Sequence, residues 1–73
     1  MYVIEFFDRK TDGLVVAYSL PELNDEDVLT LLGFPLNGNC ADLNEKQMIE
    51  LENLLGRSFN YSGYDIEICE VEK

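Results

Sequence analysis

The fold is decided by residues 2–8, whose sequence is YVIEFFD. β-Branched and aromatic residues dominate this stretch, and both types favour the pleated backbone of a strand. Successive side chains of a strand point to opposite faces, so we expect Tyr2, Ile4 and Phe6 to pack together against helices. This stretch carries more bulky apolar residues than either of the two other strands predicted below. It should therefore lie between them in the sheet.

A second strand is predicted over residues 14–19, LVVAYS, after a hairpin loop at residues 8–13. Asp12-Gly13 is the turn element of this loop, because glycine tolerates the positive φ that such loops need. Pro21 then ends the pairing, since proline has no N–H to donate to a neighbouring strand.

Two helices are predicted next, and each begins after an asparagine and ends at a glycine. The first follows Asn24 and ends at Gly33, and the second follows Asn44 and ends at Gly56. Asparagine is a good N-cap and glycine a good C-terminal cap. Gln47 can complete a capping box with Asn44. Between the helices, residues 36–43 are predicted to form a loop rich in turn residues.

Residues 64–71 predict a third strand, because apolar and acidic residues alternate along it up to Ile68. The alternation slips at Cys69, and a bulge or a strand end near Ile68–Cys69 would explain the slip. The predicted layout is therefore ββααβ within one domain, residues 1–73. It is an α+β fold, with a three-stranded antiparallel sheet and two helices packed on one face.

The face of the sheet opposite the helices is predicted to be apolar. Such positions are normally polar in a free two-layer monomer. A patch rimmed by Glu5 and Glu67 can serve a homodimer or a partner; alternatively, a loop covers it, or the face assignment is reversed. The patch would consist of Val3, Phe7, Val15 and Ala17.

Acidic residues outnumber basic residues by 15 to 5, which gives a formal net charge of −10. No basic residue lies between Lys10 and Lys46. Such a charge suits a basic protein partner, although it also serves solubility alone. Direct binding to nucleic acid or to a membrane is disfavoured, because those surfaces carry the same sign of charge.

Catalysis is not indicated. The chain has no histidine, and neither Cys40 nor Cys69 has an adjacent basic side chain that would make it nucleophilic. No calcium-loop pattern is present either. On these grounds the sequence predicts no enzyme, no metal site and no cofactor. The lack of a secretory signal or an apolar span predicts a cytoplasmic protein with two reduced thiols, although a disulfide stays open.

Three features are predicted to contact a partner. The first is the acidic start of the first helix, although a helix start also recruits acids for its own stability. The second is the loop at residues 37–42 together with Glu45 at the start of the second helix. The third is a tyrosine in the polar loop before the last strand, since tyrosine is an efficient interface anchor. The predicted contacts are Asp25, Glu26, Asp27, Asn37, Asn39, Asp42, Glu45 and Tyr61.

The order of these elements resembles small bacterial immunity proteins, the cognate inhibitors of polymorphic, contact-dependent growth inhibition or colicin-like toxins. The resemblance rests on FFDRKTDGLV at residues 6–15, on YSLP at residues 18–21, and on the acidic helix, Asn/Asp-rich loop and Gln-containing helix that follow. It implies a cytosolic protein that binds one toxin tightly and blocks its active site or substrate groove. Such toxins are often nucleases with basic grooves, which an acidic inhibitor fits.

Two other functions stay open on the sequence alone. A phage-type nucleic-acid mimic that inhibits a host nuclease would need the same surplus of acidic residues. A homodimerising structural module would use the apolar outer face of the sheet, and its charge would serve only solubility.

Overall fold

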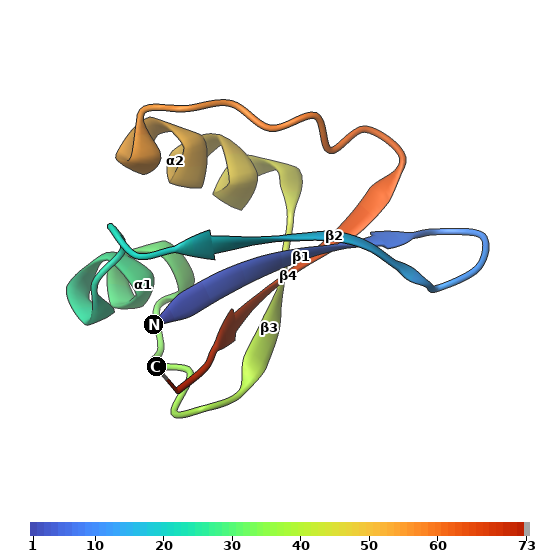
Figure 1. The fold of residues 1–73 in the computed structure, drawn as a ribbon. Helices are drawn as coiled ribbons and strands as arrows, with labels where there is room; N and C mark the ends of the chain where they lie inside the picture. The colour runs from blue at the N-terminus through green and yellow to red at the C-terminus, as the bar shows by residue number, and fades with distance from the viewer. Residues whose placement is uncertain (73) are drawn as a thin grey trace.

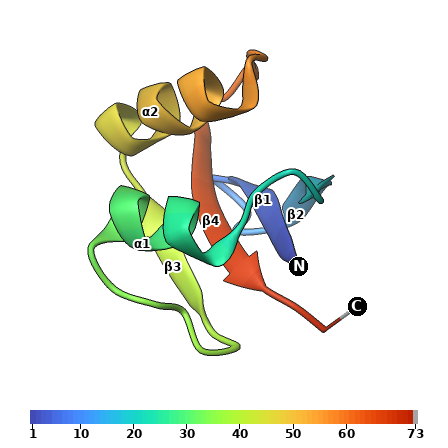
Figure 2. The same ribbon diagram turned by 90° about the vertical axis from the view of Figure 1, so that its left-hand side faces the viewer.

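Four antiparallel strands form one sheet in the order β2-β1-β4-β3, and two helices lie on one side of it (Figures 1 and 2). The structure is a computed structural model that describes residues 1–72. Its elements are β1 (Tyr2–Asp8), β2 (Leu14–Leu20), α1 (Asp25–Leu32), β3 (Cys40–Leu43), α2 (Glu45–Leu55) and β4 (Tyr64–Glu70).

The central place of β1 in the predicted sheet is confirmed, because β1 pairs with β2 on one side and with β4 on the other. Tyr2, Ile4 and Phe6 are 4%, 0% and 1% exposed, so they face the core as their alternation predicted. Side chains from both helices and the neighbouring strands enclose them. This core includes Leu20, Val28, Leu31, Met48, Leu51, Ile66 and Ile68.

The predicted count of three strands is wrong, because the segment predicted as a loop contains the fourth strand, β3. Ala41 lies opposite Ile68 and Leu43 lies opposite Ile66 in the β3–β4 pair, so these two side chains extend the core. The strand has only four residues, and the Asn-Gly-Asn sequence before it carries the turn signals of a loop. The order of elements is therefore ββαβαβ.

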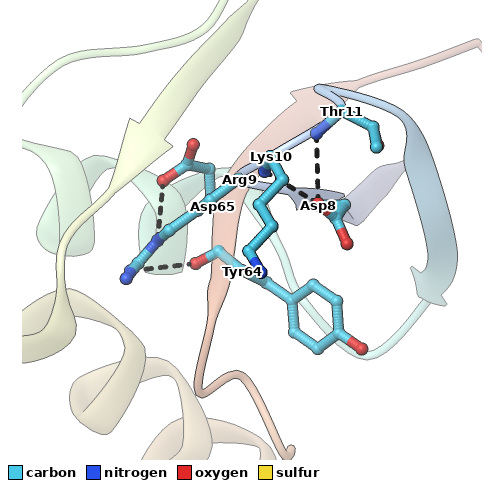
Figure 3. A network of polar contacts seen from close by, with 6 residues as sticks. All are labelled: Asp8, Arg9, Lys10, Thr11, Tyr64 and Asp65. Atoms are coloured by element: carbon cyan, nitrogen blue, oxygen red, sulfur yellow. Dashed lines mark hydrogen bonds and ion pairs between the residues drawn. The ribbon is translucent and has the colours of Figure 1, made fainter.

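The β1–β2 hairpin also differs from its prediction. The positive φ in its loop belongs to Asp12, at 58°, and Gly13 has none. The Asp8 carboxylate accepts the backbone N–H groups of Lys10 and Thr11 at 2.7 and 3.1 Å, which holds the loop in place (Figure 3). Aspartate tolerates this left-handed conformation better than most residues.

The predicted irregularity at Ile68–Cys69 is absent from the described sheet, since β4 pairs with β1 without a break from Tyr64 to Glu70. Cys69 lies on the side of the sheet away from the helices, where it pairs with Cys40. The register shift lies instead between Phe6 and Phe7, where Val15 of β2 has no partner in β1.

The predicted ends of both helices are confirmed. Asn24 and Asn44 each accept the backbone N–H three residues later at 2.8 Å. Both helices have a capping box, in which the side chain of Asp27 or Gln47 accepts the N–H of the capping asparagine. The helices thus have fixed starts, and this fixes where their acidic first turns lie.

Candidate partner-binding surface

The sheet has one side that neither helix covers, and we call it the open face (Figure 2). Its members follow from the strand register, because residues directly opposite each other share a face. The β2 side of the face is uncharged, whereas its β3 side is acidic. Its residues are Leu14, Ala17 and Ser19 of β2; Val3, Glu5 and Phe7 of β1; Asp65, Glu67 and Cys69 of β4; and Cys40 and Asp42 of β3.

Three carboxylates cross the open face in a line that we call the acidic row: Glu5, Glu67 and Asp42. Glu67 lies directly opposite Glu5 in the β1–β4 pair and directly opposite Asp42 in the β3–β4 pair. Like charges in directly opposite positions destabilise a sheet. The row therefore opposes folding on its own, and a positive group placed over it would relieve that repulsion.

The acidic row continues into two hollows of the surface. The larger is a groove of about 880 Å³ between the start of β4, the end of β3 and the loop before β4. The smaller, of about 240 Å³, is lined by residues that include Asp12 and Glu67. Asp42 and Asp65 line both hollows, so the two form one continuous acidic surface.

Arg9 is the one basic side chain that lines either hollow in the described chain. Its Nε lies 3.2 Å from the Oδ1 of Asp65, and its Nη2 donates to the carbonyl of Tyr64 at 3.2 Å (Figure 3). The side chains of this ion pair are 62% and 63% exposed, so water screens it and it contributes little stability. Asp42, Glu67 and Asp12 keep the surface negative beyond this pair.

Three of the eight predicted contacts lie at the groove. Asp42, Glu45 and Tyr61 line its wall, although they come from β3, α2 and the loop before β4. Tyr61 is half-buried and packs against the core. Desolvation raises its pKa above the ordinary value, and the charges of Glu52 and Glu45 raise it further. Tyr61 is thus a partly fixed wall of the groove, where the sequence predicted an anchor on a mobile loop.

The other five predicted contacts lie at the opposite end of the sheet. Tyr2, at the start of β1, donates its hydroxyl to Asp25 at 2.6 Å, and Tyr2 lies opposite Glu70, the last residue of β4. Asp27 is engaged in its own capping box. Asp25 and Asp27 therefore stabilise the fold, which is the alternative that the sequence left open for this helix start. Glu26 is exposed.

The loop that contains Asn37 and Asn39 lies at that same end. Asn37 has a positive φ of 52°, and the carbonyl of Asn39 accepts the N–H of Glu70 at 3.1 Å. The Glu70 carboxylate in turn accepts the N–H of Gly38 at 3.0 Å. The predicted contacts thus form two groups, one at each end of β4.

Sequence reasoning missed the contribution of Glu5, Glu67 and Asp65 to the acidic surface. It placed the first two at the rim of an apolar patch, whereas they lie in the middle of the face. Their alternation with apolar residues was visible, but the register that sets them opposite each other depends on long-range pairing. The place of Asp42 beside Glu67 depends in addition on β3, which the sequence did not predict.

The prediction of two reduced thiols is not met, because Cys40 and Cys69 form a disulfide. They lie directly opposite each other in the β3–β4 pair, which brings residues 29 apart in sequence together. Cys69 is 5% exposed, whereas Cys40 is exposed. The bond joins the acidic edge strand to the interior of the sheet.

Tyr2 is the most perturbed titratable group described. Burial, the hydrogen bond to Asp25 and the nearby charge of Glu70 together raise its pKa to about 12, and burial has the largest effect. Phenolate formation at this position would place a second negative charge beside a carboxylate. Tyr2 therefore has a structural role at the end of the sheet that lies away from the groove.

The comparisons with known proteins give one match. Residues 1–69 match a family model described as a domain of unknown function, DUF7683. No curated protein and no solved structure matches the chain. Within residues 1–72, none of the helices has the length and apolar character that crossing a membrane requires.

Proposed function

The chain belongs to the DUF7683 family, and we propose that it is a stoichiometric inhibitor, not an enzyme. Its acidic surface would bind a basic protein and occlude that protein's substrate groove. A cognate bacterial toxin with nuclease activity is the partner we favour, which would make the chain an immunity protein acting in the cytoplasm.

One observation carries this proposal: the continuous acidic surface around Asp42 and Asp65, in which Arg9 is the one basic side chain of the described lining. A nuclease presents lysine and arginine to phosphate groups. Carboxylates held on a rigid sheet compete for the same basic groups, and opposite fields speed the encounter. The unfavourable acidic row is what such a partner would stabilise.

The direct test compares two double variants with the same change in charge. Asp42→Asn with Glu67→Gln removes two charges from the acidic surface, whereas Glu22→Gln with Glu50→Gln removes two exposed charges that line neither hollow. The ligand is the toxin encoded beside this gene, and the readout is its association rate over a series of NaCl concentrations. We expect the first variant to lose about tenfold or more in association rate and the second to change little.

The Asp42→Asn/Glu67→Gln variant should also protect growing cells from the toxin less well than the control variant. An association rate that ignores both salt and the Asp42/Glu67 change would contradict the proposal, as would a neighbouring gene that encodes no toxin. If phage genes surround it and the chain inhibits a restriction or RNA-guided nuclease instead, the nucleic-acid mimic replaces the immunity protein.

The edge strand β2 supports a second candidate function, which is self-association. Residues 13–21 contain no charged residue, and Leu14, Val15 and Tyr18 are 54%, 52% and 39% exposed. A long uncharged edge strand is a template for pairing with another strand. Dimerisation through the whole open face is less favourable, because it would bring the acidic rows of two copies together.

Salt separates the two candidates. Each chain has a formal charge of −10, so salt should strengthen pairing between two copies and weaken binding to a basic partner. Sedimentation velocity over a range of protein and NaCl concentrations measures the first effect. A monomer at all concentrations and at high salt would eliminate the second candidate.

A further inference from the structure

Five side chains able to bind a metal ion gather on the acidic side of the open face. Cys40 and Asp42 are two residues apart on β3, and Glu67 and Cys69 are two residues apart on β4, so all four point the same way. Because the strands are antiparallel, the cysteines lie opposite each other and so do the acids. Glu5 of β1 completes the group from the other side of β4.

Three of these residues are close enough to share one ion. The two sulfurs of Cys40 and Cys69 and a carboxylate oxygen of Glu5 all lie within 4.8 Å of one another. Glu5 is half-buried, and Cys69 is 5% exposed. The group is therefore set into the sheet, unlike a cluster of acids on a solvated helix.

Within this group, Glu5 and Cys69 are in direct contact. The Oε1 of Glu5 lies 3.2 Å from the Sγ of Cys69. A disulfide sulfur has no hydrogen to donate, so a carboxylate gains no hydrogen bond from it. The same position is favourable when Cys69 is a thiol that donates to Glu5, or when a cation lies between sulfur and oxygen.

We propose that Cys40, Cys69 and Glu5 form a redox-gated site for a thiophilic divalent cation such as Zn²⁺. Cysteine thiolates and glutamate are ligands that zinc takes in tetrahedral sites. Two sulfurs and one carboxylate oxygen supply three positions, and water takes the fourth. Asp42 and Glu67 hold negative charge beside the site, which favours the cation.

The oxidation state of the sulfurs gates the site, because one pair of thiols cannot form a disulfide and ligate a metal at the same time. With a water-soluble phosphine as reductant, phosphorus attacks one sulfur and the S–S bond breaks. Water then delivers its oxygen to phosphorus and two protons to the thiolates, so the phosphine is oxidised as the disulfide is reduced. Zinc displaces those two protons when it binds.

The metal would take over the role of the covalent bond. In the oxidised chain, the disulfide joins β3 to β4. In the reduced chain, a bound cation would join β3, β4 and β1, and it would neutralise part of the acidic row. This inference does not depend on the proposed inhibitor function, since it concerns only the ligands and their oxidation state.

The test is a zinc titration of the chain in both redox states, with a chromophoric chelator as competitor. We expect one zinc ion per reduced chain and affinity at least about a hundredfold weaker in the oxidised chain. Glu5→Gln keeps both cysteines and removes one ligand, so it should lower the affinity of the reduced chain by about tenfold or more. Glu50→Gln, a change on exposed α2, is the matched control and should bind as the wild type does.

A second measurement keeps the proposal falsifiable if the reduced chain is less stable. Cd²⁺ gives an ultraviolet sulfur-to-metal charge-transfer band only when thiolates ligate it, and circular dichroism reports the fold of the same sample. Equal zinc affinity in the two redox states, no band in a folded reduced chain, two chains per metal ion, or wild-type affinity in Glu5→Gln would each overturn the proposal.

Discussion

The two edges of the sheet differ in length, charge and covalent attachment. At one edge, β2 has seven residues without a charged side chain, and hydrogen bonds to β1 hold it in place. At the other edge, β3 has four residues, one of them Asp42, and a disulfide fastens it to β4. Unpaired strand edges invite other strands, and short length and charge are the usual protections.

The chain therefore protects its β3 edge and leaves its β2 edge available for pairing. The β3 edge sets Asp42 directly opposite Glu67, and a disulfide joins it to β4. The β2 edge pairs well with β1 and exposes apolar side chains to solvent.

Cys40→Ser removes the disulfide from the β3 edge while leaving the buried Cys69 in place. The bond closes a loop between residues 29 apart, so its loss should lower the free energy of unfolding by about 3 kcal/mol. Urea unfolding measures this change, and hydrogen exchange should show that the amides of β3 lose protection before those of β2. Reduced wild type should behave in the same way, and an unchanged urea midpoint in both samples would contradict this explanation of the edge.

Tyr2→Phe removes the hydrogen bond that the Tyr2 hydroxyl donates to Asp25. Tyr2 lies on β1, the strand between β2 and β4. We expect a loss of about 1 kcal/mol near neutral pH, measured by urea unfolding. Tyr18→Phe is the control, because it keeps an aromatic ring on β2 and leaves Tyr2 and Asp25 in place.

The wild type should also lose stability at alkaline pH. The folded state holds the pKa of Tyr2 at about 12, against an ordinary value of 10.0, so only the unfolded chain ionises readily above pH 10. The contribution of Tyr2 is complete below pH 10 and is lost between pH 10 and 12. Tyr2→Phe should show a smaller loss across this range, and an identical loss in both proteins would contradict the assignment.

Glu67→Gln removes the middle charge of the acidic row and should stabilise the β3 edge. Two directly opposite repulsions disappear, so we expect a gain of roughly 0.5 kcal/mol in the free energy of unfolding at low salt. High salt should reduce the gain, because it screens the same repulsion in the wild type. Glu50→Gln controls for the change in net charge, and an equal gain there would indicate a general charge effect.

Val15→Lys gives the β2 edge a charged residue, as Asp42 already gives the β3 edge. Val15 is 52% exposed and has no partner in β1, so the change in stability should stay within about 0.5 kcal/mol. If β2 pairs with a second copy, sedimentation velocity should show weaker self-association in the variant at high salt. Lys46→Arg, which changes no charge, should associate as the wild type does.

Sequence reasoning placed the parts that depend on local chemistry. The strand at residues 2–8, its inward-facing residues and both asparagine caps follow from alternation and from the hydrogen bonds of a helix start. Asp12 was the exception, because aspartate and glycine both suit the loop and the sequence does not say which one takes the positive φ.

The rest depends on pairing between distant segments. Residues 40–43 have too few residues to predict a strand, and their place beside β4 is what makes Asp42 a neighbour of Glu67 and Cys40 a partner of Cys69. Three predicted contacts lie together at the groove for the same reason, whereas Asp25 and Asp27 have structural roles that only Tyr2 and Asn24 reveal. Local acidity was thus visible in the sequence, and the shape of the acidic surface was not.

The disulfide also limits how far the unfolded chain can be extended. Between Cys40 and Cys69 the chain has a sequence separation of 29, and a stretched polypeptide spans about 3.4 Å per residue, so roughly 100 Å of contour cannot be extended while the bond is intact. A single molecule held in optical tweezers would therefore unfold to a shorter final extension when oxidised than when reduced. Each molecule would report its own oxidation state as a distance.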